Sequence, residues 1–164
     1  MTESQPSEDL KPGNLLRRVK EVLGRIEHAT VATVTVDGKP WNTPVYFARQ
    51  GGSFYWISRR DAQHSTNIAN NGRVFLVVFD SSRQDASGAA AYVEAYATAL
   101  VNEHDIRGAL EAIYRRRDKP MPSASDYGVS SIHAVYHAQA LRVWSNVLHT
   151  SGEVPWDERV EIPL

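Results

Sequence analysis

The segment around Asp37-Gly38 constrains the fold more than any other part of this sequence. Residues 31–36 form a β-branched run with a period of two, and an Asp-Gly pair directly after such a run predicts a tight hairpin turn. A second strand is expected at about residues 42–48 and a third at 53–58, separated by Gln50-Gly51-Gly52. The first half of the chain is therefore predicted to be an antiparallel β-meander.

Helical patterns precede and interrupt these strands. Apolar residues at helical spacing predict an amphipathic helix that starts at Asn14, and a short helix capped by Asp61 is expected within residues 59–71. Asn102 opens a longer helix that ends in three arginines. Further strands are expected at residues 74–79, 91–101 and 131–144. Six strands and peripheral helices predict a mainly β fold, a small closed barrel, because closure removes exposed sheet edges.

The 164 residues suit a single domain. Residues 1–13 are rich in Ser, Glu, Pro and Gln and are expected to be a disordered tail. Residues 14–145 hold the barrel pattern, and residues 146–164 are expected to be a C-terminal tail. The domain boundaries are therefore predicted at residues 13 and 145.

Composition and missing motifs exclude several classes of protein. There is no cysteine, which rules out disulfide scaffolds, thiolate metal sites and cysteine nucleophiles. No apolar run approaches the roughly 20 residues of a membrane-spanning helix, and the polar, acidic start does not resemble a secretory signal, so a cytoplasmic protein is expected. A net charge of -1 argues against bulk nucleic-acid binding. The chain has no GxGxxG, GK[ST] or GxSxG motif.

Two smaller patterns carry weak functional signals. His133 and His137 share a face of the last strand, but no third ligand is evident, so they are interpreted as structural strand histidines and not as a zinc site. The run Arg115-Arg116-Arg117 could form a nucleic-acid patch. The structural interpretation is favoured, because cations stabilise a helix C-terminus and no aromatic residues are interleaved for base stacking.

The segment 58–68, SRRDAQHSTNI, carries the strongest chemical signal. It places hydroxyls, two guanidiniums and an imidazole between the end of a strand and the start of a helix. Free backbone N–H groups and the positive end of the helix dipole make such a place suited to an anion. The alternative is an ordinary solvated turn before a capped helix.

The order of these segments resembles the pyridoxamine 5′-phosphate oxidase-like family of FMN-binding split barrels. The resemblance rests on ATVATVTVDGKP, WNTPVYF, FYWISRRDAQHSTNIANNGRVFLVVFD and YVEAYATAL, which extend from Thr30 to Val101. It implies a six-stranded antiparallel split barrel, a homodimer, and one FMN in each of two grooves between the subunits.

The resemblance also implies positions for the FMN site. Thr43, Pro44 and Val45 would lie along the isoalloxazine ring and ribityl chain, with Ile57 and Ser58 beside the ring edge and phosphate. His64 takes the place of a phosphate-binding Lys or Arg, and Trp144 would form a wall of the partner subunit's site or, alternatively, belong to the core. The family's Arg on the second strand is missing, and Arg59 or Arg60 could replace it. The remaining implied phosphate neighbours are Arg60, Gln63 and Ser65.

The resemblance implies an FMN-dependent oxidoreductase acting on a small organic substrate, with no nucleic acid or membrane as partner. Oxidation of pyridoxamine phosphate itself is disfavoured, because the C-terminal segment TSGEVPWDERVEIPL lacks the Arg/His motif that goes with it. Two alternatives remain open. One is a flavin-binding sensor, carrier or stress protein without turnover, and the other is a deazaflavin- or haem-binding relative, to which HSTN at His64 is similar.

Overall fold

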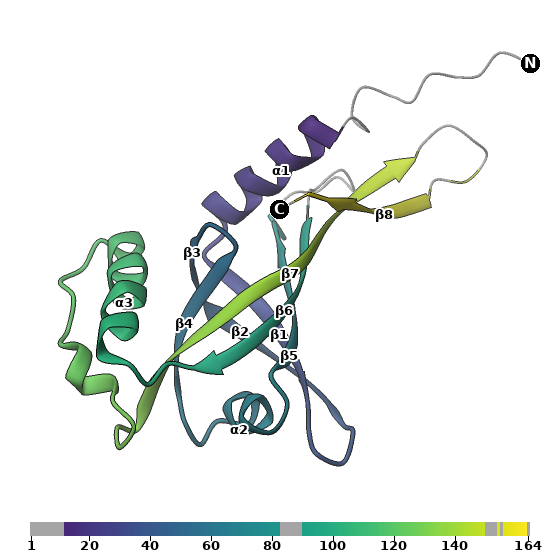
Figure 1. The fold of residues 1–164 in the computed structure, drawn as a ribbon. Helices are drawn as coiled ribbons and strands as arrows, with labels where there is room; N and C mark the ends of the chain where they lie inside the picture. Colours follow the sequence, from purple (N-terminus) through teal and green to yellow (C-terminus); the bar gives the residue numbers. More distant parts are fainter. Residues whose placement is uncertain (1–11, 83–89, 150–153, 155, 164) are drawn as a thin grey trace, which may run out of the picture.

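The computed structural model describes residues 12–82, 90–149, 154 and 156–163. Among these residues, eight antiparallel strands form one sheet, accompanied by three α-helices and a short 3-10 helix (Figure 1). The helices are α1 (Pro12–Arg25), α2 (Gln63–Asn70), α3 (Glu103–Arg117) and η2 (Ala124–Tyr127). The strands are β1 (His28–Val34), β2 (Pro40–Tyr46), β3 (Ala48–Gln50), β4 (Ser53–Arg59), β5 (Arg73–Phe79), β6 (Ala90–Ala99), β7 (His133–His149) and β8 (Trp156–Ile162).

The strand order shows why the sheet curls into a barrel. It runs β2-β1-β5-β6-β7-β4-β3, with β8 paired to β7 outside this path. β2 and β3 lie at opposite ends of the order, yet only Phe47 separates them in the chain. The two edges of the sheet must therefore meet around Phe47, which is fully buried. This closure matches the expected barrel, because closing a sheet removes its free edges.

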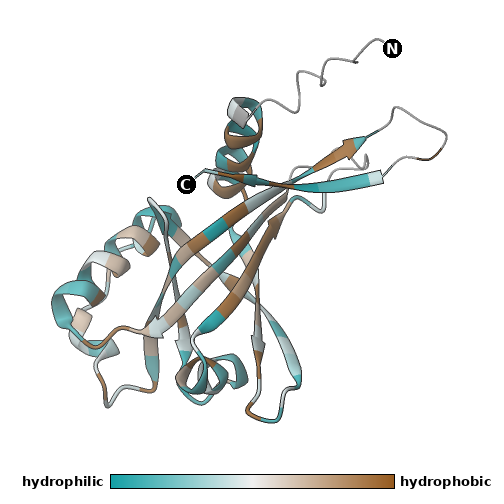
Figure 2. Ribbon diagram, turned by 45° about the vertical axis from the view of Figure 1, so that its right-hand side comes forward, coloured by the Kyte–Doolittle hydropathy of each residue, from teal (hydrophilic) through white to brown (hydrophobic). Residues whose placement is uncertain are grey.

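Helices α1 and α2 lie at opposite ends of this barrel (Figure 1). α1 contacts β5, β6 and β8, and α2 contacts β1, β2 and β6. Hydrophobic and hydrophilic residues are interleaved along α1 and the strands, as expected of elements with one buried side (Figure 2). The α1 residues Leu15, Val19, Val22 and Leu23 extend the barrel core.

A second, smaller core forms between α3 and the outside of the barrel. α3 packs against β3, β4, β7 and η2. Asn102 caps α3, because its side chain accepts hydrogen bonds from the backbone N–H groups of His104 and Asp105. The buried members of this core are Ala48, Ile106, Ala109, Leu110, Ile113, Ala124 and Val135.

The predicted mainly β fold with peripheral helices is confirmed, and the strand pattern differs in two places. The predicted second strand is divided into β2 and β3 around Phe47. β7 continues to His149, and β8 pairs with it along its length, within the segment expected to be a tail. β8 was not predicted because its residues are mostly charged and exposed, as is common for edge strands, and so do not give the alternating apolar pattern of a strand. Most of the expected N-terminal tail lies outside the described residues, and α1 begins at Pro12, two residues before the expected start.

Arg116 fastens α3 to the end of α1. Its guanidinium donates hydrogen bonds to the backbone carbonyls of Leu23, Gly24 and Ile26, and it lies 4.7 Å from the ring centroid of Phe47. The last carbonyls of a helix have no partners within the helix, so this side chain satisfies groups that would otherwise lack them. Arg117 lies over the ring of Tyr46. Arg116 and Arg117 therefore have structural partners.

Replacing Arg116 with glutamine is expected to lower the free energy of unfolding by about 1.5–3 kcal/mol, the range for hydrogen bonds to charged groups. The matched control is Arg107→Gln on the same helix, whose exposed pair with Glu103 is worth only about 0.3–0.5 kcal/mol. Urea unfolding of both variants measures the difference. Equal losses in the two variants would show that Arg116 does not hold α1.

Candidate functional site

The N-terminus of α2 is open. Its cap residue, Ala62, offers no side-chain hydrogen bond to the first N–H groups of the helix. The prediction that Asp61 caps α2 is wrong. The carboxylate of Asp61 instead accepts two hydrogen bonds from Arg59, at 2.9 and 2.7 Å. Asp61 pairs with Arg59 and does not cap the helix. The positive end of this helix is therefore left for another acceptor.

His64 lies in the first turn of α2 and points into the end of the barrel. Its side chain is 6% exposed, and its Nε2 is 2.9 Å from the Oγ of Ser58 at the end of β4. The edge of its ring meets Tyr136, which in turn stacks on Trp56. Burial lowers the pKa of His64, so the imidazole is neutral at neutral pH.

Ser65, beside His64, has a buried hydroxyl without a partner. Ser65 is 2% exposed, and its Oγ makes no hydrogen bond to any residue that the structure describes. The next helical turn is fully engaged, since Asn67 donates to the Oγ1 of Thr33 at 2.9 Å and accepts from Gln63 at 2.9 Å. A buried hydroxyl without a partner is unusual in a folded protein and indicates a place where a ligand atom can bind.

The two arginines before α2 are directed elsewhere. Arg59 is exposed and paired with Asp61. Arg60 donates from Nε to the carbonyl of Ser131 and from Nη2 to the carbonyl of Gly128, at 3.1 and 3.0 Å. Both guanidiniums therefore hold local backbone and side-chain partners in this conformation.

The structure brings some of the expected site residues together and separates others. Ser58, Gln63, His64 and Ser65 meet at the α2 end of the barrel. On β2, Thr43 is half-buried and accepts a hydrogen bond from Trp41, Pro44 is exposed, and Val45 is part of the core. Ile57 packs against the α3 core, on the opposite face of β4 from Ser58.

Trp144 lies apart from this group. It is half-buried on β7, with its ring 6.1 Å from that of Phe75 and Arg142 above it at 4.8 Å. It pairs across the sheet with Tyr92. Neither alternative for Trp144 is decided by these contacts: it is not among the fully buried core residues, and its role toward a partner subunit stays a prediction.

Sequence reasoning missed four residues that shape the site, namely Thr33, Trp56, Asn67 and Tyr136. Asn67 was the one with a usable signal, since it follows His64 by three residues and so shares its side of the helix. Tyr136 and Trp56 pair across β7 and β4, a contact that depends on strand register. Register of strands this distant in sequence cannot be read from a local pattern.

These residues fit the phosphate of a bound cofactor. The unpartnered Ser65 hydroxyl, the Ser58 hydroxyl, His64 and the uncapped α2 N–H groups all supply hydrogen-bond donors at one place. A phosphate held here would be bound by hydroxyl and N–H donors and not by a guanidinium, given the other partners of Arg59 and Arg60. The fit therefore depends on the dipole end of α2 and on burial.

Stability is expected to decrease as the pH falls below 6.5. Burial lowers the pKa of both His64 and His137 from 6.5, so between 6.5 and their lower folded-state values the unfolded chain binds more protons than the folded one. The stability these two groups confer is complete above pH 6.5 and is lost below it. Urea unfolding at about pH 7.5 and 5.5 measures this loss, and it should be smaller in His64→Gln. Equal stability of the parent protein at the two pH values would contradict the prediction.

The other histidine pattern makes no metal cluster in the part of the chain that the structure describes. His133 is exposed, and His137 bonds to the Oγ of Ser53 at 2.9 Å and stacks on Tyr55. No group of three or more His, Asp or Glu side chains comes together within the described residues. None of the described helices is long and apolar enough to cross a membrane.

Comparison with known families identifies the fold. The model of the family described as pyridoxamine 5′-phosphate oxidase matches residues 15–137, which include most of α1, all of α2 and α3, β1 to β6 and the start of β7. The chain belongs to the pyridoxamine 5′-phosphate oxidase family. The chain matches no curated protein sequence.

Several solved structures share the fold at low sequence identity. A putative 5-nitroimidazole antibiotic resistance protein from Bacteroides thetaiotaomicron has a TM-score of 0.64 and 15% identity, covering 77% of this chain and 80% of its own. A heme binding protein from Mycobacterium smegmatis has a TM-score of 0.64 and 19% identity, covering 95% of this chain and 59% of its own. An F420 reductase has a TM-score of 0.57 and 19% identity, covering 76% of this chain and 94% of its own. At these identities the likeness concerns the fold.

Proposed function

We propose that this chain binds FMN, with the flavin phosphate at the N-terminus of α2, and acts as a flavin-dependent oxidoreductase on a small organic substrate. The observation that carries the proposal is the buried, unpartnered hydroxyl of Ser65 beside the His64–Ser58 pair, at a helix end without a cap. Membership of a family with flavin-binding members supports it.

In this proposal the chain's residues bind and orient the cofactor. Ser58, Ser65 and the α2 N–H groups hold the phosphate, and His64 adds a donor that Tyr136 and Trp56 keep in place. Bound flavin supplies the transfer of hydride or electrons. The neighbouring β2 segment, with Thr43, would support the ribityl chain and ring.

We place the second wall of the site on a partner subunit of a homodimer in the cytoplasm. Half-buried and exposed aromatic residues lie on neighbouring strands of one sheet face, with cross-strand pairs linking Phe75 to Glu94 and Tyr92 to Trp144. Aromatic residues on a partly exposed sheet face are suited to an interface. Trp144 of each subunit would thus reach the flavin of the other.

The proposal is tested by the small molecule that copurifies with the protein. The expected result is a yellow protein whose released ligand has the mass of FMN. Oxidation of NAD(P)H by that protein would show that it is an enzyme and does not only bind the flavin. A colourless protein that takes up no added FMN would overturn the proposal. Light scattering should give the mass of a dimer.

A second candidate is a haem- or deazaflavin-binding protein. Burial lowers the pKa of His64, and a neutral imidazole is the form in which histidine ligates a metal such as haem iron. Solved structures with the same fold include a heme binding protein and an F420 reductase. The absorption spectrum of the purified or cofactor-supplemented protein separates haem from flavin, and ligand mass separates FMN from deazaflavin.

A further inference from the structure

A small hollow lined by three arginines lies away from the α2 site. It has a volume of about 260 Å³ and is bordered by the end of α1, by β3 and by the second half of α3. Arg49, Arg115 and Arg116 line it together with Gly24 and Gln50, and no acidic residue of the described part of the chain does. α2 contacts other strands, so this hollow is separate from the proposed phosphate site.

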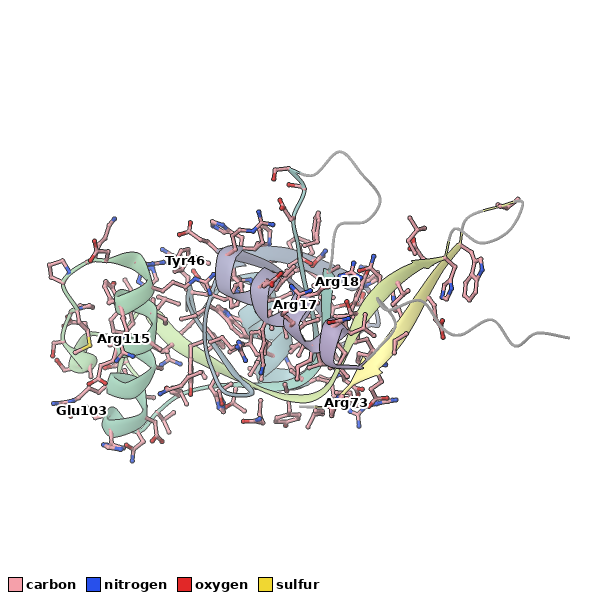
Figure 3. All side chains as sticks on the ribbon, turned by 90° about the horizontal axis from the view of Figure 1, so that it is seen from above. Arg17, Arg18, Tyr46, Arg73, Glu103 and Arg115 are labelled. Atoms are coloured by element: carbon pink, nitrogen blue, oxygen red, sulfur yellow. The ribbon has the colours of Figure 1, made fainter. Side chains whose placement is uncertain are left out.

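The three guanidiniums are held to different degrees. Arg116 is fixed by the carbonyls at the end of α1. Arg49 donates one hydrogen bond from Nη1 to the carbonyl of Gly51 at 2.6 Å, which leaves other N–H groups for a ligand. The guanidinium of Arg115 has no hydrogen-bond or ion-pair partner within the described residues. Figure 3 shows Arg115 on α3, away from Glu103 at the start of this helix.

The positive charge in this hollow is not balanced locally. Burial is the larger cause of the lowered pKa of Arg49, and the neighbouring positive charge of Arg116 lowers this pKa further. On the other side of Arg115, a larger hollow includes Glu111 and Asp118 and is balanced by them. The whole chain carries a net charge of -1, so the excess is a local feature.

We propose that this hollow binds the phosphate group of a small phosphomonoester. Arg49 and Arg115 contribute free N–H donors, and Arg116 supplies a fixed positive charge behind them. Arginine matches the geometry of phosphate oxygens through paired N–H donors. The hollow is smaller than the ~300–1,000 Å³ of pockets for drug-sized ligands, which suits a single head group. A nucleic-acid backbone would instead need a continuous basic surface.

The test is a titration of the full-length protein with inorganic phosphate at constant ionic strength, followed by the backbone amide signals of Gly24 and Gln50. These signals should shift with saturation, and the double variant R49Q/R115Q should weaken binding by at least about tenfold per arginine. Arg107→Gln, on the same helix but outside the hollow, is the control and should bind like the parent protein. Arg115→Gln alone should show an intermediate loss.

Three results would overturn the proposal. The first is phosphate binding that R49Q/R115Q leaves unchanged, and the second is shifts confined to Ser65 and the other α2 amides. The third is tighter binding of a single-stranded oligonucleotide than of phosphate, with a steep salt dependence that R49Q/R115Q removes, because that would assign the arginines to nucleic acid. None of these results depends on whether FMN binds at α2.

Discussion

Replacing His64 with alanine is expected to lower the affinity for FMN by about 10- to 100-fold. The loss corresponds to one hydrogen bond to a charged group, about 1.5–3 kcal/mol, and each 1.4 kcal/mol is about tenfold in affinity. The variant also releases the Ser58 hydroxyl from its 2.9 Å contact with Nε2. Titration of the apoprotein with FMN, followed by flavin fluorescence, measures the dissociation constant.

His137→Ala is the matched control for this prediction. Its Nε2 also lies 2.9 Å from a serine hydroxyl, that of Ser53, and its ring also contacts a tyrosine. It lies near the other end of β4, away from α2. We expect His137→Ala to bind FMN like the parent protein. Equal effects of the two substitutions, or none from either, would remove His64 from the site.

Replacing Trp56 with alanine is expected to lower the free energy of unfolding by about 3–5 kcal/mol, as for other large aromatic side chains removed from a core. Trp56 is fully buried on β4 and stacks on Tyr136 with ring centroids 5.6 Å apart. The substitution leaves a cavity beside Tyr136, whose ring contacts His64. Urea unfolding measures the loss, and FMN affinity should fall as well because His64 loses its support.

Two further tryptophan variants test whether the loss of stability in Trp56→Ala comes from lost core packing. Trp56→Phe should lower the free energy of unfolding much less than the alanine variant, because Trp56 Nε1 has no hydrogen-bond partner among the described residues and most of the ring volume is retained. Trp156→Ala removes an exposed ring that stacks on His149 and should have little effect on unfolding. A loss in Trp156→Ala comparable with that in Trp56→Ala would contradict the assignment of Trp56 to the core.

Local sequence patterns were sufficient for most of the fold. The β1–β2 hairpin follows from a β-branched run before Asp37-Gly38, and Gly38 has the positive φ that this turn requires. Asn102 capped α3 as its position indicated. Apolar spacing placed the buried face of α1. Each of these features depends on residues within a few positions of one another, so single-sequence patterns carry them.

Most of the features that local patterns missed depend on contacts between distant segments, and the cap of α2 is the exception. The sequence offered Asp61 two local roles, as the cap of α2 and as the partner of Arg59. It gave no reason to prefer the pair with Arg59, which is the one that the structure has. β8 is stabilised by pairing with β7, including the bidentate pair of Arg142 with Glu161. The Asn67–Thr33 contact spans the barrel end. Such contacts exist only after the chain has folded.

The most direct test of the phosphate site at α2 compares the binding of FMN with that of riboflavin, which has the same ring and ribityl chain but no phosphate. If Ser58, His64, Ser65 and the open end of α2 hold the phosphate, FMN should bind at least about 100-fold more tightly than riboflavin to the parent protein, and the difference should shrink in His64→Ala. Equal affinities for the two flavins would contradict the assignment of this end of the barrel to a phosphate.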